Sequence, residues 1–235
     1  MYKGKKVYAI VLAGGSGARF GGDRPKQFQM LADAPVFLHS VRKFDKIDNI
    51  DGIVLVVPPD YLAMCQDLVA EFGIAKIAAI VPGGKSRQES TFIGLSALNA
   101  DADSIIMVHD AARPFVSAHD ISALIDVTES HGAAVLAAPI ADTIKMANAD
   151  KLAMQTIDRK NLYAAKTPQA AKLADMKRAH GQAQRDGLEA TDDCQLMENI
   201  GIYPKIVTAS AINIKITTTS DLDFAAFLIE RGATL

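Results

Sequence analysis

The chain has 235 residues, of which 49% are hydrophobic and 22% are charged, and its formal net charge is −2. This composition is typical of a globular protein, and a slightly negative chain has no overall basic field that would hold nucleic acid. Its apolar runs are too short to cross a bilayer, its N-terminus lacks a signal-peptide core, and two distant cysteines do not suggest a disulfide framework. We therefore expect a cytoplasmic protein with neither a membrane nor a nucleic-acid partner.

The first apolar run and the loop behind it suggest an anion-binding site. Residues 7–12 are continuously apolar, which predicts a buried strand. Glycines at positions 14, 15 and 17 leave no Cβ in the way, so backbone N–H groups could converge on an anion. Arg19 and Lys26 then add two positive charges. The pattern favours a triphosphate-binding loop over a glycine-rich turn without a ligand.

Two familiar phosphate-binding motifs are absent from this part of the chain. The dinucleotide fingerprint would need glycine where Phe20 stands. The sequence at 84–86 ends like a P-loop, but Ala79 occupies the place of its first glycine and Pro82 interrupts the expected turn. A dinucleotide-dependent oxidoreductase and a P-loop enzyme are both disfavoured.

The next segments alternate between helical and extended patterns. Apolar spacing predicts helices at 35–46, 61–72, from the polar stretch 83–90 through 98, and from 117, and strands at 52–57, 76–81, 104–109 and 133–139. This alternation predicts an α/β fold, Rossmann-like, with a mostly parallel twisted sheet flanked by helices. Such sheets bind ligands at the carboxyl ends of their strands, where the glycine loop, the 83–90 loop and Asp110 would meet.

The alternation stops after the fifth strand. Residues 141–166 carry extended patterns without a clear helix, and we interpret them as a protruding β-arm that packs on a partner subunit, with a long surface loop as the alternative. The remaining predictions are helix 171–186, a helix start at 191–193, strands near 202–207 and 211–216, and a last helix capped by Ser220 with Asp223. We expect one domain, residues 1–235, with 141–166 as a dimerisation arm.

Asp110 is the best candidate for a metal ligand. It directly follows a buried strand, and a carboxylate that faces a triphosphate is suited to hold Mg²⁺, although a loop cap is the alternative. His109 would point to the opposite face and be structural. Arg113 would stabilise the loop by pairing with Asp110, with contact to a ligand as the alternative.

Lys215 offers a third cation at the same edge. In a strand at 211–216 it would share a face with Asn213 and Thr217, either toward solvent or toward a phosphate. Together with Arg19, Lys26 and a metal, it would suit transfer at a phosphate, where fixed cations stabilise the charge of the transition state.

The order of these motifs resembles that of the 2-C-methyl-D-erythritol 4-phosphate cytidylyltransferases, a branch of the sugar-phosphate nucleotidyltransferases in the non-mevalonate isoprenoid pathway. The resemblance covers about residues 6–230 and is carried by the stretches 12–19, 25–27, 108–114, 138–145, 158–159, 167–169, 191–193 and 213–217. It implies a homodimeric enzyme that joins CTP and methylerythritol phosphate, with release of pyrophosphate.

The resemblance also implies roles for particular residues. The nucleotide would be lined by Ala13, Gly14, Gly15, Gly83, Gly84, Arg87, Ser90, Ala111 and Thr217. Arg19, Lys26 and Lys215 would contact the phosphates, and Asp110 would bind Mg²⁺ or another divalent cation. Thr143 and Arg159 of the arm would reach into the neighbouring subunit and hold the acceptor.

Departures from the family pattern concern the acceptor side. Ala170 and Ala171 stand where an aromatic residue is usual, Ile212 replaces a polar residue, and Lys85–Ser86 replaces a small or acidic pair. Ribitol-5-phosphate cytidylyltransferase is the nearest alternative, and a nucleotide-binding regulator without turnover is the alternative from another class.

Overall fold

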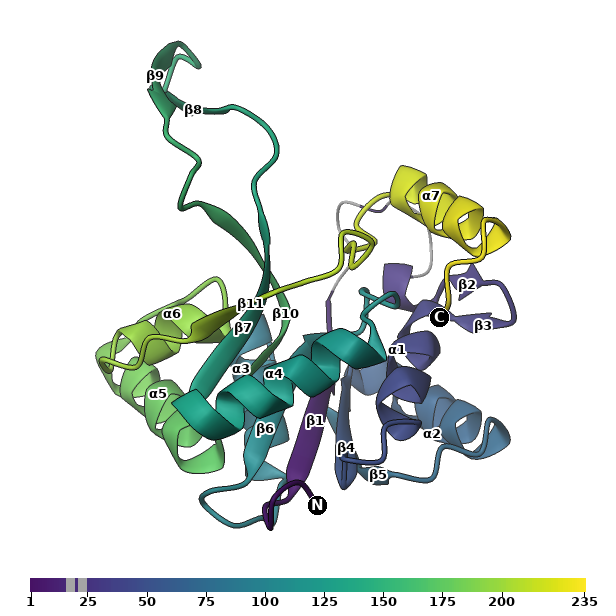
Figure 1. The fold of residues 1–235 in the computed structure, drawn as a ribbon. Helices are drawn as coiled ribbons and strands as arrows, with labels where there is room; N and C mark the ends of the chain where they lie inside the picture. Colours follow the sequence, from purple (N-terminus) through teal and green to yellow (C-terminus); the bar gives the residue numbers. More distant parts are fainter. Residues whose placement is uncertain (16–19, 21–24) are drawn as a thin grey trace.

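The fold is built on a seven-stranded sheet. The computed structural model describes residues 1–15, 20 and 25–235. The strands of the sheet lie in the order β11-β7-β10-β6-β1-β4-β5, and β10 runs antiparallel to both of its neighbours (Figure 1). The remaining neighbouring pairs are parallel, which confirms the predicted α/β class with a mostly parallel sheet.

The first half of the chain follows the predicted alternation closely. Its elements are β1 (Val7–Leu12), α1 (Val36–Asp45), β4 (Gly52–Val57), α2 (Leu62–Glu71), β5 (Ile77–Pro82), α3 (Arg87–Ser96) and β6 (Ile105–Asp110). Two short strands, β2 (Met30–Leu31) and β3 (Ala34–Pro35), and two 3₁₀ turns, Lys26–Phe28 and Pro59–Tyr61, complete it. Leu12 is in register with Val56 of β4 and with Asp110 of β6, so the loops after these strands emerge side by side.

Helices cover both faces of the sheet because its central strands are apolar on both sides. Alternate residues of β1 enter different clusters: Val7, Ala9 and Val11 pack with α1, α2 and α4 (Ala118–His131), whereas Ile10 packs with α3 and α5 (Leu173–Asp186). The chain runs outward from β1 to β5 and then returns to β6 on the other side of β1. The boundary between β1 and β6 is therefore a topological switch point, where open sheets of this kind bind ligands.

Strand β10 (Tyr163–Lys172) was not predicted. Its sequence is rich in alanine and lysine and contains Pro168, which is unfavourable inside a strand. The strand nevertheless lies between β6 and β7 (Ala133–Pro139), and its register against β7 shifts between Ala165 and Gln169. Burial of Ala170 and Ala171 between helices on the two faces explains why small residues stand there.

The C-terminal segment differs from the prediction in two places. A strand is present at β11 (Lys205–Thr208), but the predicted strand at 211–216 is wrong, because this segment is irregular and Ile216 N–H bonds the Ala112 carbonyl at 2.9 Å. The last helix, α7 (Thr219–Glu230), is capped by Thr218 with Asp221 rather than by Ser220 with Asp223. A helix α6 (Asp193–Glu198) starts where predicted, with Asp192 as its cap.

The predicted arm is a hairpin that projects from the body of the molecule. Strands β8 (Ile144–Ala147) and β9 (Ala153–Ile157) pair only with each other in an antiparallel sheet, and Figure 1 shows them far from the central sheet. Met146, Leu152 and Met154 are 51–64% exposed there. In the described part of the chain, no helix combines the length and the apolar character needed to span a membrane.

Candidate active site

A pocket of about 350 Å³ lies at the carboxyl ends of β1 and β6. Its walls come from residues 12–15, from Lys26 and Gln27, from residues 84–87 with Ser90, and from Asp110, Ala112 and Lys215. Lys26 and Lys215 therefore meet in one cavity although 189 positions separate them in sequence. Two lysine ammonium groups in one cavity can stabilise the negative charge of a bound phosphate chain.

The glycine loop is held by its own backbone and by Gln27. Ala13 N–H bonds the Val56 carbonyl at 2.7 Å, and the buried Gln27 amide donates to the carbonyls of Ala13 and Gly15 at 2.6 and 2.8 Å. Apart from its chain neighbours, none of the residues that the structure describes has an atom within 4 Å of a Cβ built on Gly15, so their packing does not require glycine there. The open space lies where a ligand could approach the backbone. Arg19 belongs to the same loop but lies outside the described residues.

The loop after β5 is shaped by Ser90. Its hydroxyl accepts from Gly84 N–H at 3.1 Å and donates to the Ser86 carbonyl at 2.8 Å, while Ser86 caps α3 by accepting from Glu89 N–H. A Cβ on Gly84 would lie 2.4 Å from the Glu89 side chain, so a larger residue here would displace Glu89 from its contact with Lys85 N–H. The loop and the first turn of α3 therefore line the pocket in a conformation that these internal hydrogen bonds hold.

Asp110 is the charged centre of the pocket. Lys215 Nζ lies 2.7 Å from its Oδ2, Arg87 Nε lies 3.4 Å from its Oδ1, and Arg113 Nε lies 3.7 Å from Oδ2. Burial alone would raise the pKa of Asp110, but Arg87, Lys215 and then Arg113 hold this pKa well below its usual range. The carboxylate is ionised at neutral pH, and the Lys215 side chain, 37% exposed, remains open to a ligand.

These residues fit Mg²⁺ in one particular mode. No group of three or more His, Cys, Asp or Glu side chains forms a metal cluster among residues 1–15, 20 and 25–235. Mg²⁺, however, is usually held by one or two carboxylates together with phosphate oxygens and waters. Asp110 is the carboxylate that lines the pocket within the described chain, so it suits a Mg²⁺ ion that arrives with a nucleotide.

Residues behind Asp110 fix its backbone. Asp110 N–H donates to Thr167 Oγ1 at 3.0 Å, and this hydroxyl lies 3.2 Å from His109 Nδ1. His109 is fully buried, stacks edge-on against Phe44, and its Nε2 lies 3.2 Å from the Arg113 carbonyl. Burial lowers the pKa of His109 to about 4, so the ring is neutral. The expectation that His109 is structural and faces away from Asp110 is confirmed.

Several residues predicted for the site lie outside the pocket wall of this chain. Ala111 is fully buried, and its carbonyl accepts a hydrogen bond from the Ser40 hydroxyl. Gly83 N–H donates to the Val57 carbonyl, and the Thr217 hydroxyl donates to the Lys215 carbonyl. Thr143 and Arg159 are in the exposed arm, where the Arg159 guanidinium donates to the Ala141 carbonyl. Their predicted contacts need either a ligand or a second subunit.

Other residues of the site were not predicted. Gln27 holds the glycine loop, and Asp193 forms an ion pair with Arg87 at 2.8 Å between Nη1 and Oδ2. From the sequence, Gln27 has no role beyond its place in the stretch 25–27, and Asp193 has only a place at a helix start.

Comparison with known proteins identifies the family. The family model described as 2-C-methyl-D-erythritol 4-phosphate cytidylyltransferase matches residues 7–231. The chain belongs to this family. It is 42% identical over 228 residues to the cytidylyltransferase of that name from Pelotomaculum thermopropionicum, with 96% of this chain and 94% of the relative covered. The cytidylyltransferase of the same name from Geobacillus kaustophilus is also 42% identical, with 96% and 98% covered.

Solved structures of this cytidylyltransferase family share the fold. A 4-diphosphocytidyl-2C-methyl-D-erythritol synthase from Anaerococcus prevotii has a TM-score of 0.84 at 28% identity, with 97% of each chain covered. The 2-C-methyl-D-erythritol 4-phosphate cytidylyltransferase of Francisella tularensis has a TM-score of 0.80 at 29% identity, with 95% of this chain and 99% of that one covered. The similarity therefore extends over the body and the arm.

Proposed function

We propose that this protein transfers a cytidylyl group from CTP to 2-C-methyl-D-erythritol 4-phosphate, giving 4-diphosphocytidyl-2-C-methyl-D-erythritol and pyrophosphate in the non-mevalonate isoprenoid pathway. The carrying observation is that Lys26, Lys215 and Asp110 line one pocket beside the glycine loop in a chain of this family. Relatives at about 40% identity over nearly the whole chain bear this name.

The reaction is an in-line displacement at the α-phosphorus. An oxygen of the acceptor phosphate attacks, the α–β phosphoanhydride bond breaks, and pyrophosphate leaves with the electron pair. Negative charge grows on the attacked centre and on the leaving group, so fixed cations lower the barrier. Lys215, which points into the pocket beside Asp110, stabilises the reacting phosphate, while Lys26 and Arg19 hold the triphosphate.

Asp110 would hold Mg²⁺ beside the triphosphate. The ion would neutralise phosphate charge and fix the phosphate oxygens, which is the chemistry it supplies in nucleotidyl transfer. Asp110 also contacts Lys215 at 2.7 Å, so the carboxylate that would hold the ion positions the ammonium group that faces the substrate.

The acceptor site would be completed by a second subunit. The arm exposes apolar side chains that its own chain does not cover, and such a surface suits a protein partner. In a cytoplasmic homodimer, Thr143 and Arg159 of the partner subunit would contact the acceptor phosphate. Two buried free cysteines, Cys65 and Cys194, suit a reducing compartment.

A substrate panel tests the proposal. Purified protein is incubated with Mg²⁺, each of the four ribonucleoside triphosphates, and either methylerythritol 4-phosphate or ribitol 5-phosphate, and pyrophosphate is measured. We expect release with CTP and methylerythritol phosphate alone. Release with ribitol phosphate instead would assign the related ribitol enzyme, and nucleotide binding without release would indicate a regulator.

A further inference from the structure

The buried carboxylate of Asp193 is the strongest feature of the molecule that the reaction above does not use. Its residue exposure is 0%, yet it does not line the pocket. Burying an ionised carboxylate costs several kcal/mol unless ion pairs and hydrogen bonds compensate it. Its Oδ1 lies 3.0 Å from His180 Nε2, and its Oδ2 lies 2.8 Å from Arg87 Nη1. The charge is therefore kept in place by two partners on other helices.

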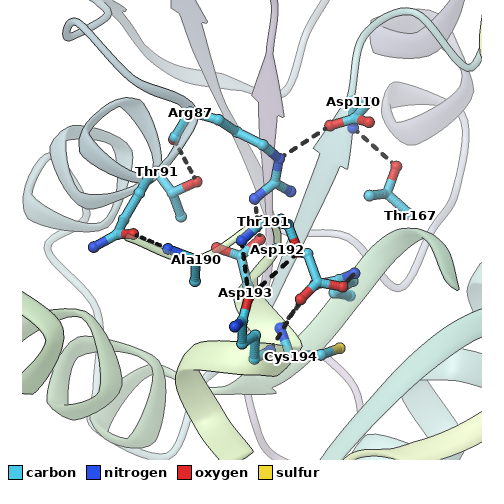
Figure 2. Close-up of polar contacts among 12 residues, drawn as sticks. Arg87, Thr91, Asp110, Thr167, Ala190, Thr191, Asp192, Asp193 and Cys194 are labelled. Carbon is cyan, nitrogen blue, oxygen red and sulfur yellow. Dashed lines mark hydrogen bonds and ion pairs between the residues drawn. The ribbon is translucent and has the colours of Figure 1, made fainter. Parts of the chain in front are cut away.

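Arg87 connects this carboxylate to the pocket. Figure 2 shows its guanidinium between Asp193 and Asp110, with Nη1 toward the first and Nε toward the second. The Asp193 contact is 2.8 Å long, whereas the Asp110 contact is 3.4 Å, so Asp193 holds the guanidinium more closely. Burial alone would lower the pKa of Arg87, but the two carboxylates raise it, and the side chain stays charged.

The segment that carries Asp193 is fastened on both sides. The Gln88 amide of α3 donates to the Leu188 carbonyl and accepts from Ala190 N–H, both at 3.0 Å. On β10, Gln169 donates to Asp192 at 2.9 Å and accepts from Cys194 N–H at 3.0 Å. These contacts fix the start of α6 against the helix α3 and the strand β10, and Figure 2 shows Ala190, Asp192 and Cys194 beside Asp193. They give Asp193 one position relative to Arg87.

We infer that Asp193 is a positioning residue for the reaction: it holds one prong of Arg87 so that Arg87 cannot engage both oxygens of Asp110. Guanidinium and carboxylate groups prefer a two-pronged contact. Without Asp193, Arg87 would turn both prongs to Asp110 and compete with Lys215 for Oδ2. The present arrangement leaves Oδ2 to Lys215 at 2.7 Å. This inference rests on the proposed cytidylyl transfer.

The direct test is Asp193→Asn, which keeps the shape and removes the charge. We expect kcat to fall by about tenfold to a hundredfold, because a displaced charge at the reacting centre costs that much. The dissociation constant of CTP, measured by calorimetry without the acceptor, should change by less than about threefold, since the glycine loop and Lys26 are untouched. Wild-type kcat in a folded Asp193→Asn variant would overturn the inference.

A second set of variants separates positioning from stability. The Arg87→Met variant leaves the buried Asp193 carboxylate without its cation, so the melting temperature of this variant should fall. Adding Asp193→Asn removes the uncompensated charge and should restore the melting temperature. Arg87→Met should itself lower kcat because Asp110 loses its contact at Oδ1, and the double variant should have the same kcat, because Asp193 acts on Asp110 only through Arg87. Independent, additive losses in kcat would contradict the inference.

Arg87→Lys decides the matter even if Asp193→Asn does not fold. Lysine keeps the positive charge but has a single ammonium group. It therefore cannot contact Asp193 and Asp110 with two separate nitrogens, as Nη1 and Nε of Arg87 do. We expect a melting temperature near that of the wild type and a kcat loss like that of Asp193→Asn; unchanged kcat would overturn the inference. Asp175→Asn, which breaks the surface pair with Arg178 at 2.9 Å, is the matched control. An inactive wild type would instead count against the proposed function.

Discussion

The pocket floor and the arm are built in opposite ways. On the floor, Asp110 is almost buried, and Lys215, Arg87 and Arg113 surround its carboxylate. In the arm, β8 and β9 pair only with each other and expose Met146 and Met154. The floor draws its residues from strands and helices far apart in sequence, whereas the arm is one local hairpin.

Under the proposed function, the floor would bind the nucleotide and the arm would bind the acceptor. The floor holds cations and ordered backbone donors within a single chain, so nucleotide binding should not depend on a partner. The arm carries Arg159, which does not line the pocket at the carboxyl ends of β1 and β6 of its own chain. Acceptor binding should therefore depend on assembly, and variants in the two regions should fail in different ways.

The largest effect should come from the floor. Lys215→Ala removes a cation that lies 2.7 Å from Asp110, and we expect kcat to fall by about a hundredfold or more, since transition-state charge loses its partner. Circular dichroism should show an unchanged fold because the side chain is partly exposed. Lys205→Ala, an exposed lysine on β11, is the control. A rate near that of the wild type would remove Lys215 from the mechanism.

The arm should give a different signature. Arg159→Ala should raise the KM for methylerythritol phosphate by about tenfold, as expected for a lost charge-assisted hydrogen bond, with little change in CTP affinity. Steady-state kinetics and CTP calorimetry measure the two quantities. A selective loss of CTP binding would contradict the division between floor and arm.

Mixing these two variants sharpens the same comparison. If the arm acts across a dimer, a mixed dimer of Lys215→Ala and Arg159→Ala chains has one intact site, built from the unmutated floor and the unmutated arm. After unfolding and refolding at equal ratios, and with the acceptor held well below its KM so that Arg159→Ala dimers are nearly inactive, about a quarter of the wild-type activity should return, because half of the dimers are mixed and each has one working site. If the arm serves its own chain, mixing should restore nothing.

A smaller effect is expected within the glycine loop. Gly15→Ala adds a methyl group that would lie more than 4 Å from every atom of residues 1–15, 20 and 25–235 outside its immediate chain neighbours, so the melting temperature should hardly change. CTP affinity should fall by roughly tenfold if the ligand approaches the backbone there. Gly181→Ala in α5, whose Cβ would meet only Arg185 at 3.7 Å, should stabilise the helix without affecting CTP. Unchanged affinity in Gly15→Ala would place the ligand elsewhere.

The smallest effect concerns stability far from both substrates. His39 is 2% exposed, and burial lowers its pKa below the 6.5 of a free side chain. The unfolded chain then takes up a proton more readily, so stability should fall as pH drops below about 6.5. His39→Gln has no such titration, and its free energy of unfolding in urea should change less between pH 7 and pH 5. Equal changes in both proteins would exclude this contribution.

Much of the fold was predictable because its signals are local. The buried strands β1, β4, β6 and β7 are apolar runs bounded by polar or glycine-rich turns, and the structure confirms each of them. Strand β10 escaped prediction because its position depends on pairing with β6 and β7 rather than on its own composition. Alternating isoleucines at 212, 214 and 216 imitated a strand, but they pack against α7 instead.

The site was predictable to the extent that its residues stand in motifs. Lys26, Asp110 and Lys215 were chosen for their chemistry and positions, and they do line one pocket. The Arg87–Asp193 pair was not predicted, because it joins residues 106 positions apart and nothing in the local sequence couples them. Sequence patterns show which groups are charged, whereas the partner of each group is decided by the sheet topology.

The place at which the hairpin leaves the sheet has a consequence for how the chain could vary. Pro139 of β7 and Tyr163 of β10 are paired neighbours in antiparallel strands, so a tight turn of two residues would suffice to connect them. The pairing of β7 with β10 therefore does not need residues 140–162. Natural or engineered chains could exchange this segment for another and acquire a different polyol specificity while the nucleotide chemistry stays the same.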